Sequence, residues 1–249
     1  GSIDTAHLAN NISIDTSGTI EAANFKQGGT NFTNSLLIGH NTTGTLNAAE
    51  RNTAVGIASL DAITSGTDNT ALGYASLTSN TTGYNNTALG AYSLRSNTTG
   101  RNNTAIGQAA LCTNTTGISN VAIGFSALNA NTTGVHNTAI GTDSLKVNTI
   151  GGSNTAVGRS TLRFNTTGVN NTAIGYQSLY DNTTGSHNTA VGFCSLKANT
   201  ASNNVAVGNN ALLSNTTGVQ NTAVGYESLK ANTTGTCNTA IGYESLKAN

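Results

Sequence analysis

The chain has no proline, methionine or tryptophan and few charged or aromatic residues. Of its 249 residues, 8% are charged, 5% are aromatic, and ten basic residues balance ten acidic ones. Hydrophobic residues, at 36%, are too few for a conventional core of this length, but a disordered chain would carry more proline and net charge. Zero net charge gives no long-range attraction to nucleic acid, and no apolar run is long enough to span a membrane. The composition predicts a regular structure that binds no nucleic acid and inserts into no membrane.

A short repeat supplies that regularity. A glycine that follows an aliphatic residue recurs from Gly39 to Gly242 every 17 residues, except for one interval of 16 between Gly192 and Gly208. The unit reads N-T-A-[VIL]-G-x-x-[SA]-L-x-x-N-T-T-G-x-x, and the short unit has lost one residue within 199–203. A unit of this length is too short for helical repeats or propeller blades.

The residue pattern within the unit favours β-structure. N-T-A-V-G alternates with the period of a strand, and S-L-x-x is a second strand candidate. The NTTG segment has turn chemistry, because Asn and Gly tolerate left-handed backbone. Asn-Gly and Asp-Gly hairpin signals are absent. We therefore predict an all-β fold, a parallel β-solenoid or β-roll with one unit per coil, over residues 34–249.

Stacked identical coils place like residues in columns. We expect an asparagine ladder, buried aliphatic and leucine columns, and an alanine column packed closely against a neighbouring surface. The asparagine ladder includes Asn52, Asn69, Asn86 and Asn103; the aliphatic column Val55, Leu72, Leu89, Ile106 and Ile123; the leucine column Leu60, Leu77, Leu94, Leu111 and Leu128; and the alanine column Ala54, Ala71 and Ala88.

Oligomeric state follows from the small apolar content of each coil. Two large aliphatic residues per coil must offset the conformational entropy of seventeen ordered residues, which one thin rod does not achieve. Association of identical rods would bury the alanine or leucine columns. We therefore expect an obligate homotrimer.

The repeated N-T-A-[VIL]-G segments, as at 52–56, 86–90 and 238–242, resemble the S-V-A-I-G repeats of YadA-like trimeric autotransporter heads. That resemblance implies a trimeric, left-handed parallel β-roll. Segments 35–46 and 69–73 are also similar to repeat regions of marine phage tail-fibre proteins, and this likeness covers residues 34–249. It implies a viral tail fibre that serves host attachment.

Residues 1–33 lie outside the period. Gly1-Ser2 is typical of an expression-tag remnant, and residues 12–15 and 18–25 are expected to form two short strands around a turn. The segment resembles the strand-turn modules that precede repeats in phage fibres. We interpret it as a cap or stalk-joining segment that covers the unpaired end of the solenoid.

Two variable columns are candidate surface-binding sites. The first is basic and is either a solubilising row or a strip that attracts anionic surface glycans. The second is aromatic and either stacks between coils or at a trimer interface, or offers rings to sugars. The basic column holds Arg95, Lys146, Arg163, Lys197, Lys230 and Lys247; the aromatic column holds Tyr74, Phe125, Tyr176, Phe193, Tyr226 and Tyr243.

No residue grouping predicts catalysis, a metal site or a cofactor. The cysteines at 112, 194 and 237 are coils apart and are expected to be free thiols. His136 and His187 share a solvent-facing column about 14 Å apart, too far to share a metal. Asp143, Glu227 and Glu244 share another column and are expected to be exposed. We therefore predict a protein that is not an enzyme.

The predicted function is structural: a trimeric fibre shaft of a phage tail fibre, located on the virion. The alternative is a bacterial surface adhesin head that binds host matrix, cells or a surface glycan or protein. A third hypothesis is an ice-binding solenoid, which the NTTG segment does not favour because adjacent threonines such as Thr81 and Thr82 would point to opposite sides of a strand.

Overall fold

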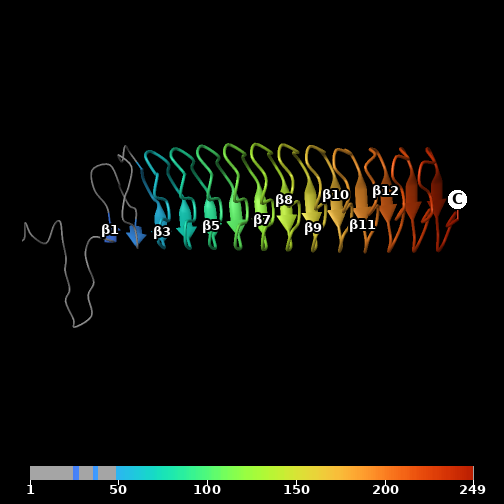
Figure 1. Ribbon diagram of the computed structural model, residues 1–249, viewed down its shortest axis with the longest axis horizontal. Coiled ribbons are helices and arrows are strands. Elements are labelled where there is room, and N and C mark those ends of the chain that lie inside the picture. The colour runs from blue at the N-terminus through green and yellow to red at the C-terminus, as the bar shows by residue number, and fades with distance from the viewer. Residues whose placement is uncertain (1–24, 28–35, 39–48, 249) are drawn as a thin grey trace, which may run out of the picture.

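The computed structural model describes residues 25–27, 36–38 and 49–248, which form one long stack of coils (Figure 1). These described residues contain strands and turns and no helix. The all-β solenoid predicted from the repeat is therefore confirmed. The two strands expected at 12–15 and 18–25 lie outside the described residues, apart from Phe25.

Each coil contributes one strand of three residues. The strands are β1 (Phe25–Gln27), β2 (Leu36–Ile38), β3 (Thr53–Val55), β4 (Thr70–Leu72), β5 (Thr87–Leu89), β6 (Thr104–Ile106), β7 (Val121–Ile123), β8 (Thr138–Ile140), β9 (Thr155–Val157), β10 (Thr172–Ile174), β11 (Thr189–Val191), β12 (Val205–Val207), β13 (Thr222–Val224) and β14 (Thr239–Ile241).

These strands form a single sheet in chain order. β1 pairs antiparallel with β2, and every later pair, from β2 with β3 to β13 with β14, is parallel. Partners in the parallel pairs are 17 residues apart, as in Thr172 with Thr189, except at the short coil, where Thr189 pairs with Val205. The missing residue therefore leaves the sheet register intact.

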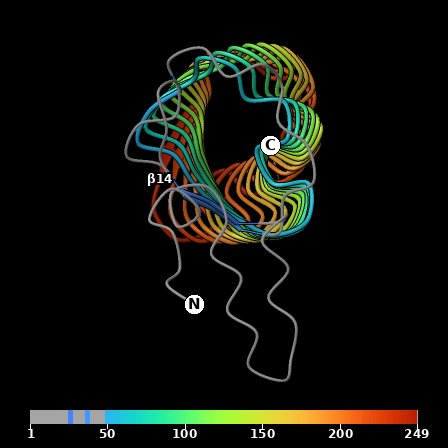
Figure 2. The ribbon, with the colours of Figure 1, turned by 90° about the vertical axis from the view of Figure 1, so that its left-hand side faces the viewer.

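The rest of each coil turns back to the sheet and closes a ring when the stack is seen along its axis (Figure 2). The S-L-x-x segment belongs to turns, so its prediction as a second strand is wrong. Its leucine has left-handed backbone, as in Leu77 with φ 49°. That conformation costs about 1–2 kcal/mol in a non-glycine residue. It bends the chain so that the leucine side chain points into the ring.

Burial separates the predicted apolar columns. The alanine and leucine columns are buried within a single chain, with Ala71 and Leu77 both 0% exposed. Because neighbouring strand residues point to opposite faces, the aliphatic residue after each alanine points outward. Leu72 is 45% exposed and Leu89 is 42% exposed. The expectation of a buried aliphatic column is therefore wrong, and the alanine and leucine columns need no second rod to cover them.

Two asparagine ladders line the polar side of the interior. In the predicted ladder, the Asn86 side-chain oxygen accepts from the backbone N–H and side-chain amide of Asn103, both at 3.1 Å. The NTTG asparagines form a second ladder, in which Asn114 Nδ2 donates to Asn97 Oδ1 at 2.8 Å. Most of these amides also donate to the carbonyl of the glycine that ends an NTTG-type segment, as Asn114 does to Gly117 at 3.1 Å, whereas Asn188 and Asn199 donate to the Ala201 carbonyl of the short coil. Hydrogen bonds between coils thus satisfy these buried amides, except next to the short coil, where Asn182 Oδ1 has no partner.

The glycine after each strand is required by the stacking distance. At Gly73, φ is +137°, and an added Cβ would lie 2.7 Å from the Gly90 carbonyl carbon and oxygen. A side chain there would force neighbouring coils apart. This explains why glycine occupies the position in every coil.

Candidate binding surfaces

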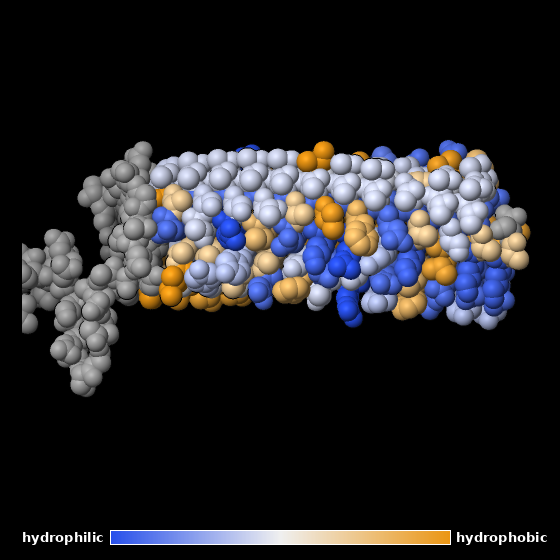
Figure 3. Space-filling view, in the orientation of Figure 1, coloured by the Kyte–Doolittle hydropathy of each residue, from blue (hydrophilic) through white to orange (hydrophobic). Residues whose placement is uncertain are grey.

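The basic column lies on the turn side of the rod and is engaged by acids of its own chain. Lys146 Nζ lies 2.9 Å from Asp143, and Arg163 reaches the same carboxylate at 3.6 Å from the next coil. On the face shown in Figure 3, the most hydrophilic residues gather towards the C-terminal half of the rod. These pairs neutralise charge that an anionic glycan would otherwise meet.

A second charge cluster joins the last two coils. Glu227 accepts from Lys230 at 2.6 Å and Lys247 at 2.7 Å, and Lys247 also contacts Glu244 at 2.8 Å. Hydrogen bonds from the two lysines lower the pKa of Glu227 to about 2. Glu227 is only 6% exposed, and Asp143 and Glu244 are half-buried in ion pairs, so the expectation of exposed, solvated acids is wrong for this column.

The two remaining basic residues of the column lie over aromatic rings. Arg95 sits 5.6 Å from the centroid of Tyr92, and Lys197 sits 5.9 Å from that of Tyr180. Every member of the basic column therefore has a partner within the chain. The arrangement fits a row that joins neighbouring coils better than a free cationic strip.

The aromatic column is exposed and partly paired. Tyr176 stacks on Phe193 with ring centroids 5.4 Å apart, and Tyr226 stacks on Tyr243 at 5.2 Å. Tyr74, by contrast, meets Tyr92 edge to face at 5.2 Å. Stacking between coils accounts for most of the column, and the outer faces and edges of the rings stay open to solvent.

The outward face of the sheet is a surface that the sequence analysis missed. Two columns run along it: the aliphatic column and, two residues earlier in each strand, a threonine column. No hydrogen bond of these threonine hydroxyls occurs within the described chain. The threonine column comprises Thr53, Thr70, Thr87, Thr104, Thr138, Thr155, Thr172, Thr189, Thr222 and Thr239, with valine at 121 and 205. The strand alternation around each buried alanine was the signal that could have revealed it.

The histidines and cysteines carry no assembled site. His136 and His187 are exposed, as expected, and the His187 ring lies 3.2 Å from the Asn170 amide. Cys112, Cys194 and Cys237 are free thiols, and burial raises the pKa of the first two. Over the described ranges, no three His, Cys, Asp or Glu residues are placed to hold a metal ion.

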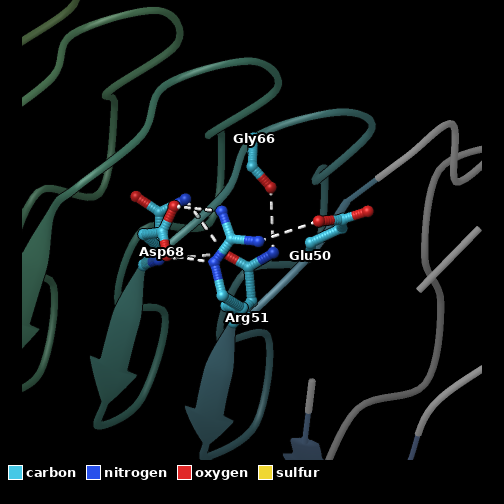
Figure 4. A network of polar contacts seen from close by, with 6 residues as sticks. Glu50, Arg51, Gly66 and Asp68 are labelled. Carbon is cyan, nitrogen blue, oxygen red and sulfur yellow. Dashed lines mark hydrogen bonds and ion pairs between the residues drawn. The ribbon is translucent and has the colours of Figure 1, made fainter. Parts of the chain in front are cut away.

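An ion-pair network closes the N-terminal end of the regular coils. Arg51 pairs with Asp68 of the next coil at 2.6 Å and with Glu50 at 2.8 Å, beside the Asn52 amide that donates to the Gly66 carbonyl (Figure 4). The Arg51, Glu50 and Asp68 side chains are at least partly exposed, and the Asp68 contact raises the pKa of Arg51 while lowering that of Asp68. The network joins two coils, and each of its three charged side chains has a partner of opposite charge.

Comparison with family models, curated proteins and solved structures finds no match to this chain. Among the described residues, no helix has the length and apolarity needed to cross a membrane.

Proposed function

We propose that this chain is a non-enzymatic structural rod, the shaft of a viral tail fibre that holds a host-attachment surface away from the particle. The observation that supports it most is the stack of coils joined by one sheet from β2 to β14. Such a stack sets length by coil number and resists bending through its ladders. Many of its charged side chains pair with charges of a neighbouring coil, which suits a spacer.

The rods assemble as homotrimers through the aliphatic column. Its members remain partly exposed along the whole rod, including Leu89 at 42% and Ile174 at 41%. Burying the rest of such a side chain contributes about 0.5–1 kcal/mol per coil, a fraction of its full transfer energy. The same face on each subunit meets around one axis, which closes the assembly. The threonine column then borders this contact.

Sedimentation of the native protein tests the assembly. We expect three chain masses, and a triple variant Leu89→Asp, Ile140→Asp, Ile174→Asp should sediment as one chain. Its matched control, Thr99→Asp, Thr133→Asp, Thr167→Asp, places the same charges on exposed NTTG positions and should remain trimeric. A single-chain mass for the unaltered protein would refute trimerisation.

The adhesin alternative rests on the exposed aromatic pairs. Tyr226 and Tyr243 are 42% and 74% exposed and stack on each other, so their edges and outer faces can meet a sugar ring of a host glycan. A fragment that binds whole cells, and loses binding in Tyr226→Ala, Tyr243→Ala, would favour an adhesin on a bacterial surface. A fragment that binds no cells would favour the shaft.

Ice binding is favoured by one observation, the row of outward threonines. Their hydroxyls repeat at the strand spacing of about 4.8 Å, which can order water along the face. Thermal hysteresis that disappears in Thr104→Leu, Thr138→Leu would support this function. Trimerisation covers the neighbouring aliphatic column, so a trimer without hysteresis would exclude it.

A further inference from the structure

The 16-residue coil interrupts the NTTG wall of the solenoid, defined here as the stacked N-T-T-G segments. In regular coils, the first two threonine N–H groups donate to the first threonine carbonyl of the next coil. Thr166 and Thr167, for example, reach the Thr183 oxygen at 2.8 and 3.3 Å. No such bond joins Thr183 or Thr184 to Thr200. The threonine hydrogen bonds of the wall are therefore missing between β10's coil and β11's coil, and the contacts that remain there include Ser186 N–H to Ser202 Oγ at 2.9 Å and Asn188 Nδ2 to the Ala201 carbonyl at 2.8 Å.

Side-chain bonds are lost at the same junction. Thr166 Oγ1 donates to the Thr183 carbonyl at 3.0 Å, but Thr183 Oγ1 makes no equivalent bond. The ladder of NTTG asparagines also breaks here. Asn199 Nδ2 donates to the Ala201 carbonyl at 2.8 Å but makes no bond to Asn182 Oδ1 of the coil before. Asn182 Oδ1 is left buried without a hydrogen-bond partner. A buried acceptor without a partner is destabilising, so this junction is weaker than its neighbours.

The missing residue changes which atoms of the next coil lie beside the glycine of the NTTG segment. At Gly151, the space next to the glycine faces Asn165 Nδ2 at 2.9 Å from a built Cβ. At Gly185 the corresponding atom is the Thr200 carbonyl oxygen, also at 2.9 Å. Beside Gly185 a backbone carbonyl therefore lies where the next coil places a side-chain amide beside Gly151. No amide of the next coil bonds to Asn182 Oδ1, which has no hydrogen-bond partner.

The opposite side of this junction stays closed. Thr172 and Thr189 remain paired in the sheet, and Tyr176 stacks on Phe193 across the two coils. Leu179 N–H donates to the Ser195 carbonyl at 3.0 Å, and Lys197 lies over the Tyr180 ring. The NTTG wall therefore lacks its threonine hydrogen bonds at this junction, while the sheet and the Tyr176–Phe193 stack hold the two coils together.

We propose that the junction between residues 182–185 and 199–202 is a hinge at which the rod bends by opening its NTTG wall. The sheet and the Tyr176–Phe193 stack form the closed side about which the coils tilt. A rod with such a joint can change direction at a defined coil. The hinge depends on the coil geometry alone and holds whichever proposed function is correct.

Hydrogen exchange with residue-level fragmentation tests the hinge. We expect the amides of Thr183 and Thr184 to exchange at least about tenfold faster than those of Thr166 and Thr167. Inserting a threonine after Thr200 together with Ala201→Gly restores N-T-T-G and should make the rates equal. Equal rates in the unaltered protein, or unchanged rates in the insertion variant, would overturn the proposal.

A transplant keeps the test decisive if the insertion variant does not fold. Deleting Thr133 together with Gly134→Ala copies the short coil elsewhere and should create fast exchange at Thr115 and Thr116. Electron micrographs should show a kink at the native position in the unaltered rod and a second kink in the transplant. A transplant that exchanges and bends like the unaltered rod would contradict a hinge built by the short coil.

Discussion

Inside the solenoid each position holds nearly the same side chain in every coil, whereas the outer columns vary from coil to coil. Leu111 and Leu128 repeat in the buried leucine column, but the column after them holds cysteine at 112 and asparagine at 129. The interior must satisfy one geometry that recurs at every coil. The outer columns need only tolerate solvent or a neighbour, so they are free to carry charge pairs and rings.

Backbone space gives the sharpest contrast between interior and surface. Gly107→Ala adds a Cβ at φ +126° and 2.6 Å from the Gly124 carbonyl oxygen, and should lower the free energy of unfolding by about 3 kcal/mol or more. Gly152→Ala, in a variable column where a Cβ meets Val135 O at 3.1 Å, should cost less than about 1 kcal/mol. Urea unfolding measures both, and equal losses would contradict the stacking argument.

A leucine inside the solenoid and a leucine on its outward face form a second matched pair. Leu111→Ala empties a fully buried site and should cost about 2–5 kcal/mol in thermal or urea unfolding. Leu89→Ala on the outward face should cost clearly less per chain, because Leu89 is already 42% exposed. Its effect should instead appear as weaker association in sedimentation, and a larger loss than Leu111→Ala would reverse our assignment of the two columns.

Adjacent asparagines separate the ladder from the surface. Asn103→Ala removes bonds to Asn86 and Gly117 and the acceptor of the Asn120 N–H, and should cost about 2–3 kcal/mol. Asn102→Ala removes one exposed contact with Asn85 and places alanine on left-handed backbone (φ 58°), so it should cost less than about 1 kcal/mol. Similar midpoints for the two variants would show that the ladder contributes little.

The Glu227 cluster should give the smallest effect, seen in pH dependence. Its carboxyl has a pKa of about 2 in the folded chain, below its ordinary value of 4.5. The stabilisation is therefore present above about pH 4.5 and is lost as the pH falls towards 2. Glu227→Gln should lower stability at pH 7 and approach the unaltered protein near pH 2, and a difference that grows on acidification would contradict the ion-pair assignment.

Sequence periodicity was sufficient to predict the parallel solenoid and the Asn52–Asn69–Asn86 ladder. The 17-residue interval places like residues one above another in any in-register stack. It was insufficient for Leu72 and Leu89, because apolar character alone does not say which side of a strand faces inward. It also could not place Lys230 and Lys247 on Glu227, since that contact depends on the tilt of side chains between coils.

The sequence by itself determined the period, the N-T-A-[VIL] strand and the segment 199–203 that lacks a residue, because each is a matter of order along the chain. Only the tertiary structure decided that alanine and leucine fill the interior while the aliphatic column faces out. The left-handed backbone at residues such as Leu77 turns the coil and sets those directions. It also decided that the short coil keeps its sheet register and breaks its NTTG wall, because hydrogen bonds between coils depend on where Thr200 and Asn199 come to lie in space.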